Sequence, residues 1–172
     1  GIQWDLMLKF IEEKEVENAK DTEKETTRTN IKNALRGTSK YSNKYIGNYR
    51  NAELTLNRGK FAQYGAFSNW YKFDSIDKTN LVTGSKKLSQ SSSSNSVLLT
   101  TGASEDTKLQ NIYDIAGNVW ECTLEFYNAS NPCTYRGGSF FYGASGSPAR
   151  YRYYDYTSIA NNNIGFRVGL WK

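Results

Sequence analysis

The chain has 172 residues, of which 38% are hydrophobic and 23% charged, and it carries a net charge of +5 with no histidine. This length and composition predict one globular domain with a real core and many loops. Basic residues are dispersed among acidic ones, so we expect no nucleic-acid site. No apolar run of about 18 residues occurs, so we expect no membrane span. Without histidine, the commonest general base and metal ligand are missing.

The first fifty residues predict helices followed by a loop. Apolar residues at helical spacing predict an amphipathic helix over residues 3–15. Residues 16–29 are nearly all charged or polar, so they either extend this helix in solvent or form a loop. Residues 30–35 are a candidate short helix, and residues 37–51 are expected to be an extended loop. Gly1 opens almost directly onto the first helix with no signal peptide visible, so we expect an N-terminal part of the domain to be missing.

The central part of the chain has the weakest patterns. Residues 54–67 are expected to be irregular and rich in turns, and residues 68–73 to form a local aromatic core. Residues 85–96 are rich in serine, which predicts a flexible surface loop. Residues 97–101 predict a short apolar strand, and residues 111–115 a strand or a turn.

Three strands are predicted in the last third. Residues 120–127 alternate apolar and polar side chains, which predicts a half-buried strand with the apolar side inward. Residues 134–141 predict a second strand, broken by two glycines, and residues 165–171 a third. Residues 142–163 are dense in Tyr, Ser, Asn and Gly and too long for a plain connection. Such long loops are usually functional or disordered.

Three sequence blocks carry a family resemblance. They read YDIAGNVWE at residues 113–121, YRGGS at 135–139 and IGFRV at 164–168. In this order and spacing they resemble the formylglycine-generating-enzyme-like (sulfatase-modifying factor) domain superfamily. The resemblance implies one α+β domain over residues 1–172 with a C-type-lectin-like fold, which has a small twisted antiparallel sheet, flanking helices and extensive loops. The residues expected to have structural roles are Trp120, Glu121, Arg136, Gly137, Gly138, Gly165, Phe166 and Arg167.

Several of these roles have a direct physical reason. The Trp120 indole is best placed in the core, while the Glu121 carboxylate is expected to accept backbone N–H or arginine donors. Arg136 and Arg167 are expected to be buried anchors that bind loop carbonyls and carboxylates, because a guanidinium has five donors.

The resemblance also bears on catalysis. Active formylglycine-generating enzymes bind copper through two cysteines after the Arg-Gly-Gly-Ser block, and those positions fall at about Tyr142 and Ser147 here. A phenol and a hydroxyl cannot replace two thiolates for copper(I), and iron-dependent relatives need histidines that this chain lacks. We therefore expect no enzyme activity of the known types and no cofactor, with calcium at Asn118 and Glu121 as an open alternative.

Cys122 and Cys133 are the only cysteines. If their strands pair as a hairpin, the two could face each other and form a disulfide, which the loop-entropy model values at roughly 2–3 kcal/mol. A disulfide would favour an extracytoplasmic setting. The alternative is a free buried Cys122 and a free Cys133 in a loop.

Residues 140–163 combine aromatic anchors with small polar residues, as antibody paratopes do. They also resemble the variable region of proteins diversified by retroelements, which share this fold and end that region at Gly-Phe-Arg. The resemblance implies a non-enzymatic ligand-binding module on a phage tail or bacterial surface, outside the cell, that recognises a protein or glycan on a target cell. The alternatives are an enzyme of the superfamily with unknown chemistry, a structural domain of a surface protein, or an undiversified member with a tyrosine-rich loop. The candidate ligand-binding residues are Phe141, Tyr142, Ser147, Tyr151, Tyr153, Tyr154, Asp155, Tyr156, Ser158, Asn161, Asn162 and Asn163.

Overall fold

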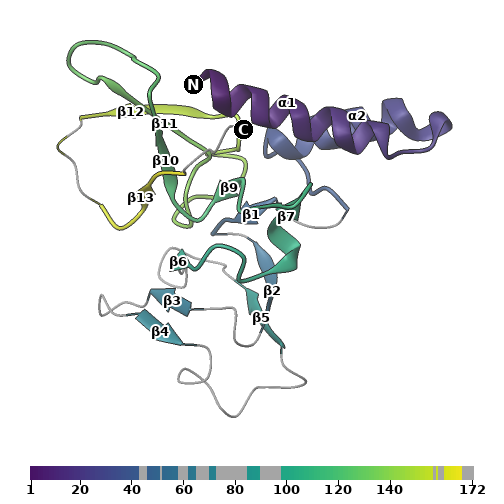
Figure 1. The fold of residues 1–172 in the computed structure, drawn as a ribbon. Coiled ribbons are helices and arrows are strands. Elements are labelled where there is room, and N and C mark those ends of the chain that lie inside the picture. The colour runs from purple at the N-terminus through teal and green to yellow at the C-terminus, as the bar shows by residue number, and fades with distance from the viewer. Residues whose placement is uncertain are drawn as a thin grey trace.

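The computed structural model describes residues 1–42, 46–50, 52–57, 62–64, 70–72, 85–89, 98–156, 158 and 161–167. Figure 1 shows a helical pair beside the sheet of the C-terminal third, with the short strands of the central chain on the far side of the molecule from the helices. The architecture is therefore mixed α+β with several small sheets.

The helices are longer than the sequence pattern predicts. Helix α1 spans Ile2–Glu17, a 3-10 turn spans Asp21–Glu23, and helix α2 spans Lys24–Leu35. Most of the charged segment 16–29 is thus helical, because ion pairs such as those of Arg28 with Glu12 and Glu13 join the polar faces of the two helices. Trp4, Leu8 and Ile11 of α1 enter the core with Ile31 and Leu35 of α2. The apolar side chains of Ile2, Leu6 and Phe10 are exposed, so the predicted apolar face of the first helix is only partly buried.

The core lies between the helices and the strands. Ile11 and Ile31 come from the helices, and Tyr49 and Leu54 from the segment after them. Ile115 joins them from the motif block in the last third. These side chains are almost fully removed from water, and such burial is the main favourable term in folding.

The central chain forms more strands than expected. Strand β2 (Glu53–Asn57) pairs antiparallel with β5 (Ser85–Ser89), and β3 (Ala62–Tyr64) lies between β4 (Trp70–Lys72) and β6 (Leu98–Leu99). The predicted flexible loop at 85–96 is therefore wrong for its first five residues, because pairing to a strand with buried leucines provides the order that their own polar side chains do not. Residues 90–96 and the side chains of the predicted aromatic core at 68–73 lie outside the described residues.

Two short ladders link the core to the motif blocks. Strand β1 (Gly47–Asn48) pairs in parallel with β9 (Ala116–Gly117), and β7 (Lys108–Leu109) pairs antiparallel with β8 (Ile112–Tyr113). At Gly47 a Cβ atom would lie 1.5 Å from the carbonyl oxygen of Ala116, so only glycine permits this approach. The segment 37–51, predicted as a loop, thus contains one short strand.

The main sheet has the order β12-β11-β10-β13. Its strands are β10 (Trp120–Thr123), β11 (Cys133–Arg136), β12 (Arg152–Asp155) and β13 (Ile164–Gly165). The predicted antiparallel sheet is wrong in one part, because β13 runs parallel to β10. The segment 142–163 is not only loop, since β12 lies within it as an edge strand.

Strand β10 ends at Thr123, before the predicted end of the strand at residue 127, and both Trp120 and Glu121 at its start are buried. Leu124 and Phe126 are exposed, at 103% and 68%, whereas Glu121 is buried and Glu125 half-buried. Phe166 is exposed too, and residues 168–171 of the predicted third strand lie outside the described residues. The predicted alternation over 120–127 is therefore wrong, because the chain leaves the sheet before Leu124 and Phe126, and both faces of the strand are buried at its start.

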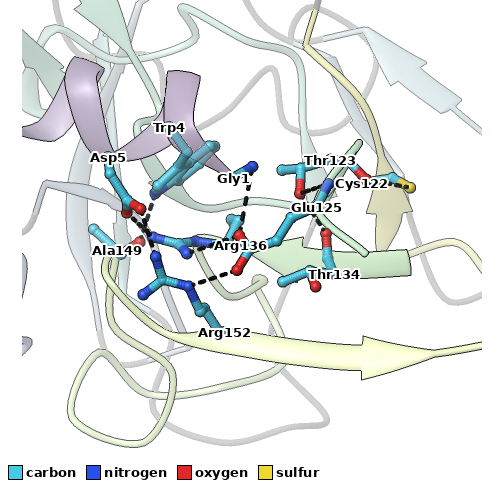
Figure 2. Close-up of polar contacts among 10 residues, drawn as sticks. All are labelled: Gly1, Trp4, Asp5, Cys122, Thr123, Glu125, Thr134, Arg136, Ala149 and Arg152. Atoms are coloured by element: carbon cyan, nitrogen blue, oxygen red, sulfur yellow. Dashed lines mark hydrogen bonds and ion pairs between the residues drawn. The ribbon is translucent and has the colours of Figure 1, made fainter. Parts of the chain in front are cut away.

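An arginine network holds Glu125, just beyond the end of strand β10 (Figure 2). The Arg136 side chain is fully buried, and its guanidinium donates to Asp5 of α1 and lies 3.5 Å from Glu125. Arg152 on the neighbouring strand binds the same two carboxylates. Trp4 completes the contact by donating its indole N–H to the carbonyl of Ala149. Charged side chains therefore fill the space between α1 and the sheet, and of these only Arg136 is fully removed from water. Its ion pairs with Asp5 and Glu125 compensate its burial, although its Nε and Nη1 have no hydrogen-bond partner among the described residues.

The cysteines do not form the expected opposed pair. The register places Cys122 opposite Tyr135, so Cys133 lies on a diagonal of the same sheet face. Both thiols are free, and Cys122 is exposed rather than buried. Partial burial, and then the neighbouring Cys133, raises the pKa of the Cys122 thiol.

Candidate functional site

The glycine pair after strand β11 shapes the site. Gly137 and Gly138 adopt φ angles of 87° and 76°, which non-glycine residues rarely adopt. A Cβ on Gly138 would lie 2.2 Å from the carbonyl oxygen of Ser147, so the following loop can fold back onto the strand end. The Phe140 N–H donates to the carbonyl of Asn118 at 2.9 Å and ties this loop to the motif turn.

Three tyrosines surround Trp120 at this place. The ring centroids of Tyr142, Tyr151 and Tyr153 lie 6.0, 5.9 and 5.5 Å from that of Trp120. Trp120 is only 5% exposed, as the sequence predicts for a core residue, but the three tyrosines are 40% to 46% exposed. The indole is therefore the base of a surface cluster of aromatic rings, which we call the Trp120 cluster.

A pocket of about 390 Å³ opens at this cluster. Arg50 and Ser147 line it together with the four rings of the cluster. The remaining lining residues are small, namely Gly143, Ser145 and Gly146. This volume lies in the range of small-molecule sites, which combine apolar and aromatic walls with a few polar groups.

The aromatic surface extends beyond the pocket along strand β12. The ring of Tyr154 lies 5.9 Å from that of Tyr153 and stacks on Tyr127 at 3.9 Å. Tyr156, just after the strand, is 54% exposed. Contiguous exposed aromatic patches are typical of interaction sites, whereas single exposed apolar residues are common on any protein surface.

The structure does not bring all the candidate ligand-binding residues to this surface. Ser158, Asn161 and Asn162 are exposed, but they do not line the pocket. Asn163 is buried, and its carbonyl accepts the N–H of Trp120 at 2.7 Å. Asn163 therefore serves the scaffold, because it joins the end of the segment to strand β10.

Two further candidates are only partly accessible. Phe141 is half-buried, with its ring centroid 4.2 Å from that of Phe140. Asp155 is half-buried, and its carboxylate accepts the following backbone N–H, that of Tyr156.

Sequence reasoning missed Arg50 as a pocket residue. Its backbone N–H donates to the carbonyl of Tyr142 at 3.0 Å, so a contact across more than ninety positions brings it to the pocket. Nothing in the polar segment around Arg50 signals that contact. Trp120 was assigned to the core alone, although it also lines the pocket.

A second, smaller cavity of about 230 Å³ lies at the motif turn. There the Arg167 guanidinium donates to the Glu121 carboxylate and to the carbonyls of Tyr113 and Asp114. Burial raises the pKa of Glu121, and it raises that of Asp114 to about 6. Arg167 is an anchor between the last block and the first, as its donors suggested, but the prediction that it is buried is wrong, because the residue lies exposed at the rim of this cavity.

The oxygens considered for calcium have protein partners. The Asn118 amide oxygen accepts the Asn48 amide and the Leu99 N–H, each at 3.0 Å, while Glu121 pairs with Arg167. Among the residues that the structure describes, no three Cys, Asp or Glu side chains come together in a way that could hold a metal ion.

The helical pair and the small twisted sheets form an α+β domain of the C-type-lectin-like kind found in formylglycine-generating enzymes. The family model of the sulfatase-modifying factor enzyme 1-like domain matches residues 12–170, so the chain belongs to this family. No curated protein and no solved structure matches it. None of the helices in the described part is long and apolar enough to cross a membrane.

Proposed function

We propose that the chain is a non-enzymatic ligand-binding module and that the Trp120 cluster with its pocket is the binding site. The observation that carries this proposal is the gathering of three exposed tyrosines around one buried indole. Tyrosine supplies a large, rigid contact area that is both apolar and able to hydrogen-bond, and it therefore dominates binding surfaces.

The rigidity of the site supports the same function. The backbone N–H of Tyr142 donates to Ser139 and that of Tyr151 to Pro148, while Tyr153 lies in strand β12. Local backbone bonds thus hold the loop, and its tyrosine side chains are left for contact. A preorganised site binds more tightly because less ordering entropy opposes binding.

The chemistry of the pocket argues against the family's catalytic reactions. Of the residues that the structure describes, those that line it include no cysteine or carboxylate. Tyr142 and Ser147, the positions that the resemblance assigns to copper-binding cysteines, both line the pocket and carry hydroxyl groups. Hard hydroxyl oxygens do not substitute for soft thiolates on copper(I). The site is therefore suited to binding without metal chemistry.

We further propose that the chain is a variable protein diversified by a retroelement and displayed on a phage or bacterial surface. The support is that exposed tyrosine, serine and asparagine side chains lie between two blocks whose arginines anchor the scaffold. Such a segment can change its side chains without disturbing those anchors. A neighbouring reverse-transcriptase gene and a near-copy of the codons for residues 136–167 are expected in the genome, and the absence of both would refute this part.

The binding proposal is tested by changing Tyr142, Tyr151 and Tyr153 together to serine. Immobilised glycan and peptide arrays serve as probes, and Leu124→Ser with Phe126→Ser is the matched control, because these exposed side chains are not among those that line the pocket. The triple variant should lose binding while its melting temperature stays within a few degrees. Binding that survives the triple change, or a triple variant that unfolds, would overturn the proposal.

A further inference from the structure

The pocket is distinguished by the arginine at its wall. Of the described residues that line it, Arg50 alone is charged, and its side chain is half-buried. No ion pair joins the Arg50 guanidinium to a carboxylate within the described part of the chain. The other guanidinium groups beside the sheet, those of Arg136, Arg152 and Arg167, all pair with carboxylates.

A pocket guanidinium that has no carboxylate partner among the described residues favours an anionic ligand. Removing a charge from water is costly unless an opposite charge compensates it. A planar guanidinium binds a carboxylate through two parallel hydrogen bonds, which adds both strength and direction. Because Arg50 is held beside the tyrosine loop through its backbone bond to Tyr142, a carboxylate paired with it would lie against the Trp120 cluster.

The rest of the pocket matches a sugar ring. A pyranose has C–H groups on its faces and hydroxyls around its rim. The negative faces of aromatic rings attract such C–H groups, whereas phenol and serine hydroxyls can bond the rim. Tyr151, Tyr153 and Ser145 provide these partners, and the volume of about 390 Å³ is sufficient for one sugar ring with its substituents.

We propose that the ligand of this pocket is a carboxylated sugar residue, such as a sialic or hexuronic acid at the end of a glycan. The carboxylate pairs with Arg50 and the ring packs on the tyrosines. This inference rests on the proposed binding function and specifies its ligand class. A glycan is favoured over a peptide because the pocket combines aromatic faces with hydroxyls.

Calorimetric titration of the purified chain tests the inference with matched probes. Sialyllactose is compared with lactose, a glucuronic-acid disaccharide with its glucose counterpart, and a short acidic peptide is included. Each acidic sugar should bind at least tenfold more tightly than its neutral partner. Arg50→Gln should remove this preference, whereas Arg150→Gln removes the same charge from an exposed arginine outside the pocket lining and should not.

A second variant distinguishes a lost preference for acidic sugars from misfolding. Arg50→Lys keeps the charge but not the paired donors, so it should retain part of the preference for acidic sugars. Equal affinity for acidic and neutral sugars, or an unchanged preference in Arg50→Gln, would overturn the inference. Binding of the peptide alone, lost in the triple tyrosine variant, would overturn the sugar ligand but leave the binding function intact. If no probe binds, the sugar inference fails, and the binding function is then decided by the arrays with the triple variant.

Discussion

The buried carboxyl group of Asp114 should make the stability of the domain depend on pH. Burial dominates its environment and raises its pKa from 3.8 to about 6, although the Gly102 N–H donates to it. Asp114 has a φ of 48°, a conformation that asparagine tolerates well. Asp114→Asn therefore keeps the shape, the backbone conformation and a hydrogen-bond acceptor, but removes the buried charge.

The size and the sign of this effect on stability follow from the raised pKa of Asp114. A difference of about two pKa units corresponds to about 3 kcal/mol, since one unit is worth about 1.4 kcal/mol. The folded pKa lies above the unfolded one, so the folded state binds the proton more strongly. The contribution of Asp114 to the free energy of unfolding is fully present below about pH 4. It is lost as the pH rises to about 6 and stays lost above that pH. Asp114→Asn should therefore be more stable than the parent at pH 7 by up to about 3 kcal/mol, and nearly equal to it at pH 4.

Urea unfolding of both proteins from pH 4 to pH 8 measures this difference. Asp21→Asn is the control, because Asp21 is exposed and its pKa is lowered by Lys24. It should give a small change of the opposite sign. If Asp114→Asn is less stable at pH 7, or if its advantage is the same at pH 4 and pH 7, the reasoning about the buried carboxyl is refuted.

Four other predictions follow from the scaffold and the site. Trp120→Ala should destabilise the domain by about 3–5 kcal/mol, and an unchanged unfolding midpoint would show that the indole is not a core residue. Gly138→Ala should lower the melting temperature, because its Cβ would lie 2.2 Å from a backbone carbonyl oxygen. Gly146→Ala should not lower it, because the nearest atom to its Cβ would lie 3.7 Å away. Equal melting temperatures of the two variants would contradict the loop geometry. A thiol reagent should label exposed Cys122 rapidly and Cys133 more slowly, and if neither reacts until a reductant is added, the two form a disulfide. Titration with copper(I) should give no stoichiometric binding, and one tightly bound copper per chain would contradict the proposed absence of metal chemistry.

The motif blocks predicted much of the scaffold. The turn before Trp120, the burial of its indole and the bonds of Glu121 with Arg167 all follow from local residue chemistry. The parallel pairing of β13 with β10 could not be predicted, because strand direction depends on how the chain crosses the sheet after β12. Local sequence contains no information on that crossing.

The errors at Leu124 and Phe126 have another cause. The alternating pattern does not show where the strand ends, and β10 ends at Thr123, before both residues. Beyond that point, contacts distant in the sequence decide what is buried, because Glu125 pairs with Arg136 and Arg152. Arg50 was missed for the same reason, since only the folded chain brings it to the tyrosine loop.

Hydroxyl-radical footprinting of the chain with and without its strongest array ligand tests the central claim most directly. The account predicts that the ligand protects Tyr142, Tyr151 and Tyr153 from oxidation, while exposed Leu124 and Phe126 remain equally reactive. Protection of Leu124 and Phe126 with no change at the three tyrosines would contradict the account and place the binding site on another surface.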